Sequence, residues 1–546
     1  MDTSSDDVFR NDTDSTEIIN DSNESSEKEG PGKIFSLANI GLVICPAIST
    51  SVATLLMSFY YQFFIIYLGA SGNLHSFNSG SYSLAQVLSF GIAILSDGYP
   101  IFGRRRKPYQ IMAWSFYILV CIVFIAIPLP PPRHIFSVDS PSENVTCEML
   151  FQERLSNPNF RDADTYLNYG FLYLFLIAFA VVSLTTVGAT FNGLIVDWTK
   201  QVMFSQRGKL QTHIIVLQTI LNGLNYFILG FGFNWYRYAG PWCKGITMTQ
   251  LFIILLVFGI IGLFSTIFFV TEKRGNYKPV KFSQFFSRLW ETVRMVSWQK
   301  LVLFVFFASG CQLVISPADA LIVEYWIKQE SLTGTWASIG SELFSAILIG
   351  VFSTYIVNGN WRYLLLASQG FFTFINFTLT NLAIFDVLRN QYLYTPDTVF
   401  KNVNMNLYIV LLLIFGVEYT EKGFEATFVT GLTLALNAGT SFFNTIAVFI
   451  SAPFNVSTAE RYLSDTREDE FFVALVSFIF NCINFFVLLS VIKLMPINKT
   501  HCKHLKETTK RSSTSAVIFL FCFVGIWVVN ISLTAFMPII QRRLAH

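Results

Sequence analysis

Long runs of apolar residues recur along the whole chain and are separated by short polar segments. A helix needs about 20 residues to cross the hydrocarbon of a bilayer, and about thirteen of the runs reach this length. Their approximate bounds are 44–68, 77–97, 109–129, 168–192, 211–232, 248–270, 301–325, 333–357, 362–385, 405–419, 424–450, 471–494 and 514–538. The pattern predicts an all-α polytopic membrane protein, in which the first and tenth runs are the least regular.

The composition agrees with a chain that lies mostly in a membrane. Hydrophobic residues make up 53% of the 546 residues and aromatic residues 16%, whereas charged residues make up only 13%. The formal net charge of +2 argues against a nucleic-acid partner. The six His are dispersed, and no His/Asp/Ser constellation points to an enzyme. The eight Cys form neither a CxxC nor a Cys/His pattern, so we expect no metal site and no cofactor.

Five segments follow from this pattern. Residues 1–35 carry many acids and few apolar residues, which predicts a disordered tail. Residues 36–270 and 301–495 each hold six of the apolar runs. The basic connection 271–300 divides them, and its Phe and Trp at helical spacing predict a helix on the inner membrane surface. Residues 496–546 hold a basic loop and an extra transmembrane helix.

A polar turn at residues 96–109, SDGYPIFGRRRKPY, connects the second and third runs. Clusters of Lys and Arg stay on the cytoplasmic face of a membrane, so this turn predicts a cytoplasmic N-terminus. Asp97 closes an apolar helix, where a carboxylate is costly unless it is paired. Arg104 and Arg105 are candidates to pair with it, although Arg104 and Arg106 can also serve only as topology signals, and Gly103 keeps the turn tight. We expect Asp97 to have a structural or switching partner.

A few ionisable residues interrupt the apolar runs, and they are functional candidates because an unpaired charge is costly in hydrocarbon. Asp319 follows Pro317 in the seventh run, where proline breaks the helix and frees a backbone carbonyl, as in the binding sites of transporters. We expect Asp319 to contact a proton or a ligand. Asp197 ends the fourth run and Glu425 opens the eleventh, where each either has such a role or pairs with Arg or Lys.

The connections that this topology places outside carry candidate modification sites. Asn144 and Asn455 begin Asn-x-Ser/Thr triplets there and are predicted glycosylation sites. Cys147 and Cys243 also fall in outside connections, where they either pair or remain free. We expect the plasma membrane as the place of residence.

Four motifs occur in order between about residues 96 and 440. They are the turn SDGYPIFGRRRKPY, RGKLQT at 207–212, SPADA at 316–320 followed by WRYLL at 361–365, and KGFEAT at 422–427 followed by Asn437. Together they resemble the signature of the folate-biopterin transporter family of the major facilitator superfamily. The resemblance implies a major facilitator fold of two six-helix halves, here with one extra C-terminal helix.

The resemblance also implies a function and a set of roles. The chain would be a secondary active transporter that moves a small organic solute, such as folate, biopterin or a related pteridine, by alternating access and with a proton. Gln211 and Asn437 would join Asp197, Pro317 and Asp319 in binding the substrate or the proton.

A gate on the cytoplasmic side is part of the same implied mechanism. Asp97 and Arg105 would hold that side closed against the start of the eleventh run, where Gly423 and Glu425 lie. The positive end of a helix dipole at that start would favour the carboxylate.

Two other functions remain open from the sequence. The polar turn is shared across the superfamily, so a symporter for a sugar or another organic solute is possible. A receptor or scaffold that does not transport is the alternative from another class, and the acidic tail would then bind partners.

Overall fold

The computed structural model describes most of the chain outside the termini and several connections. The described residues are 40–60, 63, 72–129, 164–202, 204, 207–235, 242, 244–272, 281–313, 316–454, 456, 462 and 466–544. The predicted acidic tail, the glycosylation sites Asn144 and Asn455, and the cysteines Cys147 and Cys243 lie outside them. Within the described part the elements are all helical, as the apolar runs predict.

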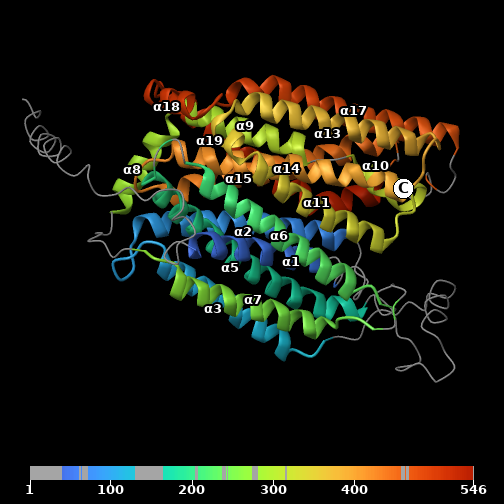
Figure 1. The fold of residues 1–546 in the computed structure, drawn as a ribbon, viewed down its shortest axis with the longest axis horizontal. Coiled ribbons are helices and arrows are strands. Elements are labelled where there is room, and N and C mark those ends of the chain that lie inside the picture. The colour runs from blue at the N-terminus through green and yellow to red at the C-terminus, as the bar shows by residue number, and fades with distance from the viewer. Residues whose placement is uncertain are drawn as a thin grey trace, which may run out of the picture.

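The first six long helices lie side by side in the lower part of Figure 1. They are α1 (Gly41–Tyr60), α2 (Gly72–Gly98), α3 (Lys107–Ala126), α5 (Asp164–Lys200), α6 (Lys209–Gly232) and α7 (Met248–Phe269). One cluster of buried apolar side chains joins all six and contains no residue beyond position 270. We call this six-helix group the N-half.

The next six crossings form the upper part of Figure 1, which we call the C-half. Its crossings are α9 (Val296–Leu313) with α10 (Pro317–Leu321) and η5 (Ile322–Trp326), α11 (Ser331–Val351), α13 (Trp361–Ile384), α14 (Gln391–Tyr419), α15 (Glu425–Ser451) and α17 (Arg467–Val491). Shorter helices lie beside them, namely α12 (Ser353–Asn358), η6 (Ala452–Phe454) and η7 (Ile492–Leu494). The helix break predicted at Pro317 separates α9 from α10, and Ser316 caps the new helix start.

Three further helices complete the chain. The helix α8 (Phe282–Val293) lies where the sequence predicts a surface helix, and α18 (Lys499–Glu507) precedes the long extra helix α19 (Ser513–Leu544). Figure 1 shows α8 and α18 at the same end of the bundle. We call this end, which also carries the 99–106 turn, the basic side.

Nine described helices are long and apolar enough to cross a membrane: α1, α3, α5, α6, α7, α11, α14, α15 and α17. Four further described helices, α2, α9, α13 and α19, lie at other predicted runs, and α2, α9 and α19 contain shorter apolar stretches.

Several boundaries differ from the prediction, among them the end of α5 at Lys200 where residue 192 was predicted, and two others have a clear physical reason. The tenth crossing begins at Gln391, well before the predicted residue 405, because Asp397, Asn404 and Asn406 face other helices and are buried. The seventh begins at Val296, inside the predicted 271–300 connection, because Trp298 packs against aromatic rings of α15 and α19.

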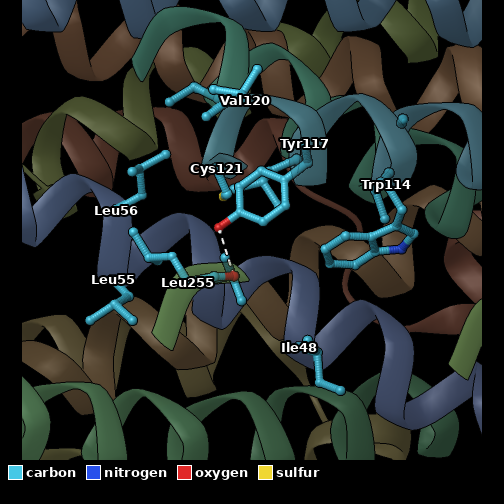
Figure 2. Packing of buried hydrophobic residues seen from close by; sticks show 14 of the residues in the cluster. Ile48, Leu55, Leu56, Trp114, Tyr117, Val120, Cys121 and Leu255 are labelled. Carbon is cyan, nitrogen blue, oxygen red and sulfur yellow. Dashed lines mark hydrogen bonds between the residues drawn. The ribbon is translucent and has the colours of Figure 1, made fainter. Parts of the chain in front are cut away.

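Close packing of α3 on α7 illustrates how the N-half is held together. Figure 2 shows the Tyr117 hydroxyl of α3 pointing at Leu255 of α7, whose carbonyl accepts a hydrogen bond of 3.4 Å from it. A Cβ placed on Gly262 would lie only 2.5 Å from the Trp114 ring. The two helices therefore approach each other over a position that has no room for a side chain.

We expect Gly262→Leu to destabilise the N-half, because overpacking a dense core costs about 1–3 kcal/mol or more. The measurement is the melting temperature of the purified protein in detergent. Gly340→Leu is the matched control, since a Cβ at Gly340 would meet no atom within 4 Å. Equal melting temperatures for the two variants would contradict the close α3–α7 contact.

Candidate functional site

The polar turn after α2 reverses the chain within a few residues. Ile101 and Arg104 exchange two backbone hydrogen bonds of 2.8 and 3.0 Å across it. Phe102 and Gly103 both have positive φ, 52° and 71°, a conformation that glycine adopts without steric cost. The turn thereby sets the start of α3 beside the end of α2, so that Arg106 faces Asp97.

Arg106 is the centre of a buried ion cluster. Its side chain is only 1% exposed, and its Nη2 donates to Asp97 Oδ1 at 3.1 Å and to Glu425 Oε2 at 2.9 Å. Its Nη1 donates to Asp197 Oδ2. The three carboxylates come from α2, α5 and α15, so one guanidinium joins both halves. We call Asp97, Arg106, Asp197 and Glu425 the Arg106 cluster.

Asp97 makes a second connection between the halves. Its Oδ2 accepts hydrogen bonds from the backbone N–H of Thr427 at 2.8 Å and from the Thr427 hydroxyl at 2.9 Å. Its Oδ1 lies 3.4 Å from the N–H of Ala426. These groups belong to the first turn of α15, where the helix dipole favours an anion. The sequence places this contact near Gly423, and the structure places it one turn later.

The predicted gating cations lie around this cluster and not at its centre. Arg105 Nη2 donates to the Asp97 carbonyl at 3.3 Å, and Arg105 Nη1 lies 3.9 Å from Glu425. Arg104 contributes the backbone pair that closes the turn. The sequence left open whether Arg106 is only a topology signal, since three adjacent arginines give no indication of which one points inward. Asp197, predicted to bind substrate or a proton, is paired with Arg106.

Glu272 was also missed by the sequence analysis, and it holds the start of α3. Its carboxylate accepts backbone N–H groups of Arg105, Arg106 and Lys107 at 2.8–3.3 Å. The Lys107 ammonium donates to the carbonyls of Ile267 and Val270, at 2.8 Å each. The end of α7 therefore fixes the backbone that carries Arg106.

Further contacts between the halves surround the cluster on the basic side. Lys200 Nζ donates to the Thr420 carbonyl at 2.9 Å. Lys499 Nζ, in the α18 helix, donates to the Phe204 carbonyl at 3.3 Å, and burial lowers the pKa of Lys499 to about 8. The basic side is therefore closed in this structure.

Gly193 makes the closed arrangement sterically possible. A Cβ at this position would lie 2.5 Å from Arg106 Nε and 2.8 Å from the Ala426 Cβ. We expect Gly193→Leu to push α5 away from α15 and to favour opening of the basic side. The measurement is the rate at which a water-soluble maleimide modifies a cysteine introduced at Val417, which is buried against Val196 of the N-half in the closed arrangement. Gly340→Leu is again the control, and equal labelling rates in both variants would contradict the close contact.

A polar cavity of about 360 Å³ lies between the halves beyond the cluster. Its described lining comes from α1, α2, α5, α6 and α15 and contains no charged side chain. The Thr430 hydroxyl in this lining is buried and has no hydrogen-bond partner. The polar lining residues are Ser49, Thr50, Thr54, Ser58, Gln86, Ser89, Thr185, Asn192, Gln218, Thr430 and Thr433.

A second polar cavity of about 350 Å³ adjoins the first at Ser58. Gln329 and Ser331, at the start of α11, line it, so it lies toward the end opposite the basic side. The two cavities together extend from the centre of the bundle toward that end, whereas the Arg106 cluster closes the other.

Asp319 lies inside the C-half and does not line either cavity. Its Oδ1 atom is buried and has no hydrogen-bond partner. The Asp319 side chain faces Asn376 and Asp397. The Asn376 amide donates to Asp397 Oδ1 at 2.9 Å and accepts from Asn481 at 3.1 Å. Two carboxyl groups therefore share one amide network. Pro317 contributes the first position of the helix that carries Asp319.

Glu342 of α11 is a further buried acid that the sequence analysis missed. The residue is 5% exposed, and its carboxyl group faces the amides of Asn402 and Asn406 of α14 and of Asn222 of α6. Its Oε2 has no hydrogen-bond partner, and neither has Asn222 Oδ1. Because Asn222 belongs to the N-half, this acid lies at the contact between the halves. A lone acid within an apolar run is the signal that could have identified it.

The other two predicted binding residues have different surroundings. Gln211 is buried, and its amide donates to Thr199 Oγ1 at 3.0 Å, which joins α6 to α5 near the basic side. Asn437 lies one helical turn beyond the cavity residue Thr433, and its Nδ2 is buried without a partner. The structure thus places Asn437 next to the cavity residues and Gln211 away from them.

The fold matches several solved transporters. A structure of the proton:xylose symporter XylE with 6-bromo-6-deoxy-D-glucose gives a TM-score of 0.56 at 11% identity, and covers 88% of this chain and 99% of that chain. A D-xylose–proton symporter gives 0.52 at 12% identity over 85% and 98%. The human organic anion transporter MFSD10 gives 0.50 at 13% identity over 84% and 100%.

Comparison with protein-family models finds no match, and comparison with curated proteins finds none either. The structural matches span nearly the whole length of each transporter and most of this chain. On this evidence, the chain has the fold of the major facilitator superfamily.

Proposed function

We propose that this protein is a secondary transporter that moves a small organic solute across a membrane by alternating access. The observation that carries the proposal is the pairing of a closed basic side with a polar cavity that extends toward the opposite end. A single cation joins both halves across the closed side, so breaking its contacts would let the halves rock apart. A receptor or scaffold that does not transport would not need a side that opens and closes.

The cavity favours an uncharged polar solute. Its described lining offers hydroxyl and amide groups, and no cation that would neutralise the two carboxylates of a folate. A biopterin-type pteridine, with ring nitrogens and hydroxyl groups, fits this chemistry and the sequence resemblance. A sugar is the second candidate, since the same groups hydrogen-bond sugar hydroxyls and two of the matched structures are xylose symporters.

We also propose that a proton drives transport. Asp319 and Asp397 inside the C-half, and Glu342 at the contact between the halves, are described carboxyl groups outside the Arg106 cluster that are available to carry it. Glu342 is the strongest of the three candidates for the proton site. If the halves rock apart, Glu342 separates from Asn222 and becomes exposed to water.

The distribution of charge also favours one orientation in the membrane. We propose that the basic side faces the cytoplasm of the plasma membrane, because most connecting Lys and Arg gather there. Asn144 and Asn455 would then carry glycans on the outside. A shift in electrophoretic mobility after glycosidase treatment, lost in the Asn→Gln variants, tests this orientation.

The function itself is tested by uptake into proteoliposomes that contain the purified protein. Labelled biopterin, folate and xylose are compared with and without an inward proton gradient, and empty liposomes are the control. We expect gradient-dependent uptake of biopterin or xylose and little uptake of folate. If folate uptake exceeded the uptake of biopterin and of xylose, the result would contradict the proposed substrate class. Binding of all three without any uptake would favour a receptor.

A further inference from the structure

A large apolar cavity of about 730 Å³ lies on the flank of the bundle, apart from the polar cavities. Its walls come from α2, α8, α9, α15 and α19, and almost all its lining side chains are aliphatic or aromatic. This volume falls within the range of roughly 300–1,000 Å³ that ligand sites occupy. Its residues belong to membrane-crossing helices and to the surface helix α8, so it faces the bilayer and not the solute path.

The cavity spans the contact between the halves. Val87 and Phe90 come from α2 of the N-half, and Phe428 and Leu434 come from α15 of the C-half. These are the helices that Asp97 joins to Thr427, and Thr427 itself lines the cavity. An occupant would therefore contact both halves beside the Arg106 cluster.

The outer wall of the cavity is the extra helix α19, which is fastened to the C-half. Val296 N–H donates to the Lys510 carbonyl at 3.1 Å, and Ser512 N–H donates to the Arg294 carbonyl at 3.0 Å. The Ser515 hydroxyl donates to Gln299 Oε1 at 3.0 Å. From this attachment α19 extends along the flank, and its side chains cover the seam between α2 and α15.

The basic end of the cavity carries an excess of positive charge. Arg294 and Arg511 lie at 2.7 and 3.1 Å from the two oxygens of Glu291, so two cations share one acid. Arg288, on the same α8 helix as the lining residue Leu289, is exposed, and so is Lys510. Cations at the membrane surface attract anionic lipid headgroups by about 1 kcal/mol each.

We propose that an anionic phospholipid binds here, with an acyl chain in the apolar cavity and its phosphate against Arg288 and Arg511. Guanidinium groups pair with phosphate oxygens in a bidentate manner. The acyl chain would pack against α2 and α15 together. The bound lipid therefore stabilises the arrangement in which the basic side is closed. The extra helix α19 thereby makes the conformational equilibrium depend on the lipid composition of the membrane.

Lipid retention by the full-length protein tests the proposal. Protein purified in mild detergent is mixed with dioleoyl phosphatidylglycerol or dioleoyl phosphatidylcholine, and bound lipid is counted by native mass spectrometry. We expect the phosphatidylglycerol to bind about tenfold more tightly than the phosphatidylcholine. The reason is the excess of positive charge, since Arg288, Arg294, Lys510 and Arg511 outnumber Glu291 at this end of the cavity. Glycerol phosphate without acyl chains is the third probe, and it should not compete. Equal retention of both lipids, or full competition by glycerol phosphate, would overturn the proposal.

Matched variants separate the two parts of the site. Leu520→Trp fills the cavity from α19 and should reduce retention of the phosphatidylglycerol at least about tenfold, whereas Phe521→Trp, at an 81% exposed position that does not line it, should not. Arg288→Gln with Arg511→Gln should remove the preference for the anionic lipid and leave acyl-chain binding. The melting temperature of each variant without added lipid shows whether it is folded. Wild-type retention by a folded Leu520→Trp would also overturn the proposal.

Discussion

Arg106→Ala is expected to abolish most transport while the protein still reaches the membrane. The change leaves Asp97, Asp197 and Glu425 as three carboxylates without their shared cation. Breaking a buried ion pair by removing one partner costs about 3–5 kcal/mol, which corresponds to more than a hundredfold shift away from the closed basic side. Arg106→Lys should recover little of the transport activity, because a compact ammonium cannot contact three carboxylates in the way that a planar guanidinium does.

The measurement pairs solute uptake with surface abundance. Uptake by Arg106→Ala should fall at least about tenfold at equal abundance, in line with that free-energy change, and the maleimide reaction at position 417, which is buried in the closed arrangement, should accelerate. Lys503→Ala is the control, since Lys503 is exposed and its salt bridge is with Glu507 on the same helix. Normal uptake by Arg106→Ala would show that the cluster does not control the gate.

Glu342→Gln is expected to separate solute movement from the proton gradient. The amide keeps the size of the side chain and still faces the amides of Asn222 and Asn402, but it cannot take up or release a proton. Accumulation against a gradient should fall to the equilibrium level, and the rise of uptake with falling outside pH should disappear. Exchange of labelled for unlabelled solute should continue, because the halves can still rock.

A matched acid outside the membrane serves as the control. Glu330→Gln, at the exposed start of α11, should leave the pH dependence unchanged. Asp319→Asn measures the contribution of the second acidic network. Unaltered accumulation in Glu342→Gln together with loss in Asp319→Asn would move the proton site into the C-half and contradict our assignment.

Much of the fold follows from the sequence because lipid imposes one rule on every crossing. Each backbone polar group must be satisfied within the helix, so a long apolar run can be read as a helix without knowledge of its neighbours. The break at Pro317 and the tight turn at Gly103 follow from local backbone chemistry in the same way. The start of α14 does not, because Asp397 and Asn404 are polar residues whose burial depends on partners in other helices.

The candidate site was less predictable for a related reason. Sequence periodicity shows which face of a helix is buried but not which helix covers it. Asp97 could be selected because it ends an apolar run, yet its partner Thr427 is 330 residues away. Which of Arg104, Arg105 and Arg106 points inward depends on the backbone of the turn and on Glu272. Asp319 was expected to contact a proton or a ligand, and its neighbours Asn376 and Asp397 on α13 and α14 could not be read from the sequence.

The most direct test of the account is whether the basic side must open during transport. Gln201→Cys and Glu421→Cys place two thiols beside the contact between Lys200 and the Thr420 carbonyl, which joins the halves at 2.9 Å. Joining them with a short reducible cross-linker should stop uptake, and cutting the linker should restore it, while neither single cysteine responds. Undiminished uptake by the fully cross-linked protein would contradict alternating access through this side.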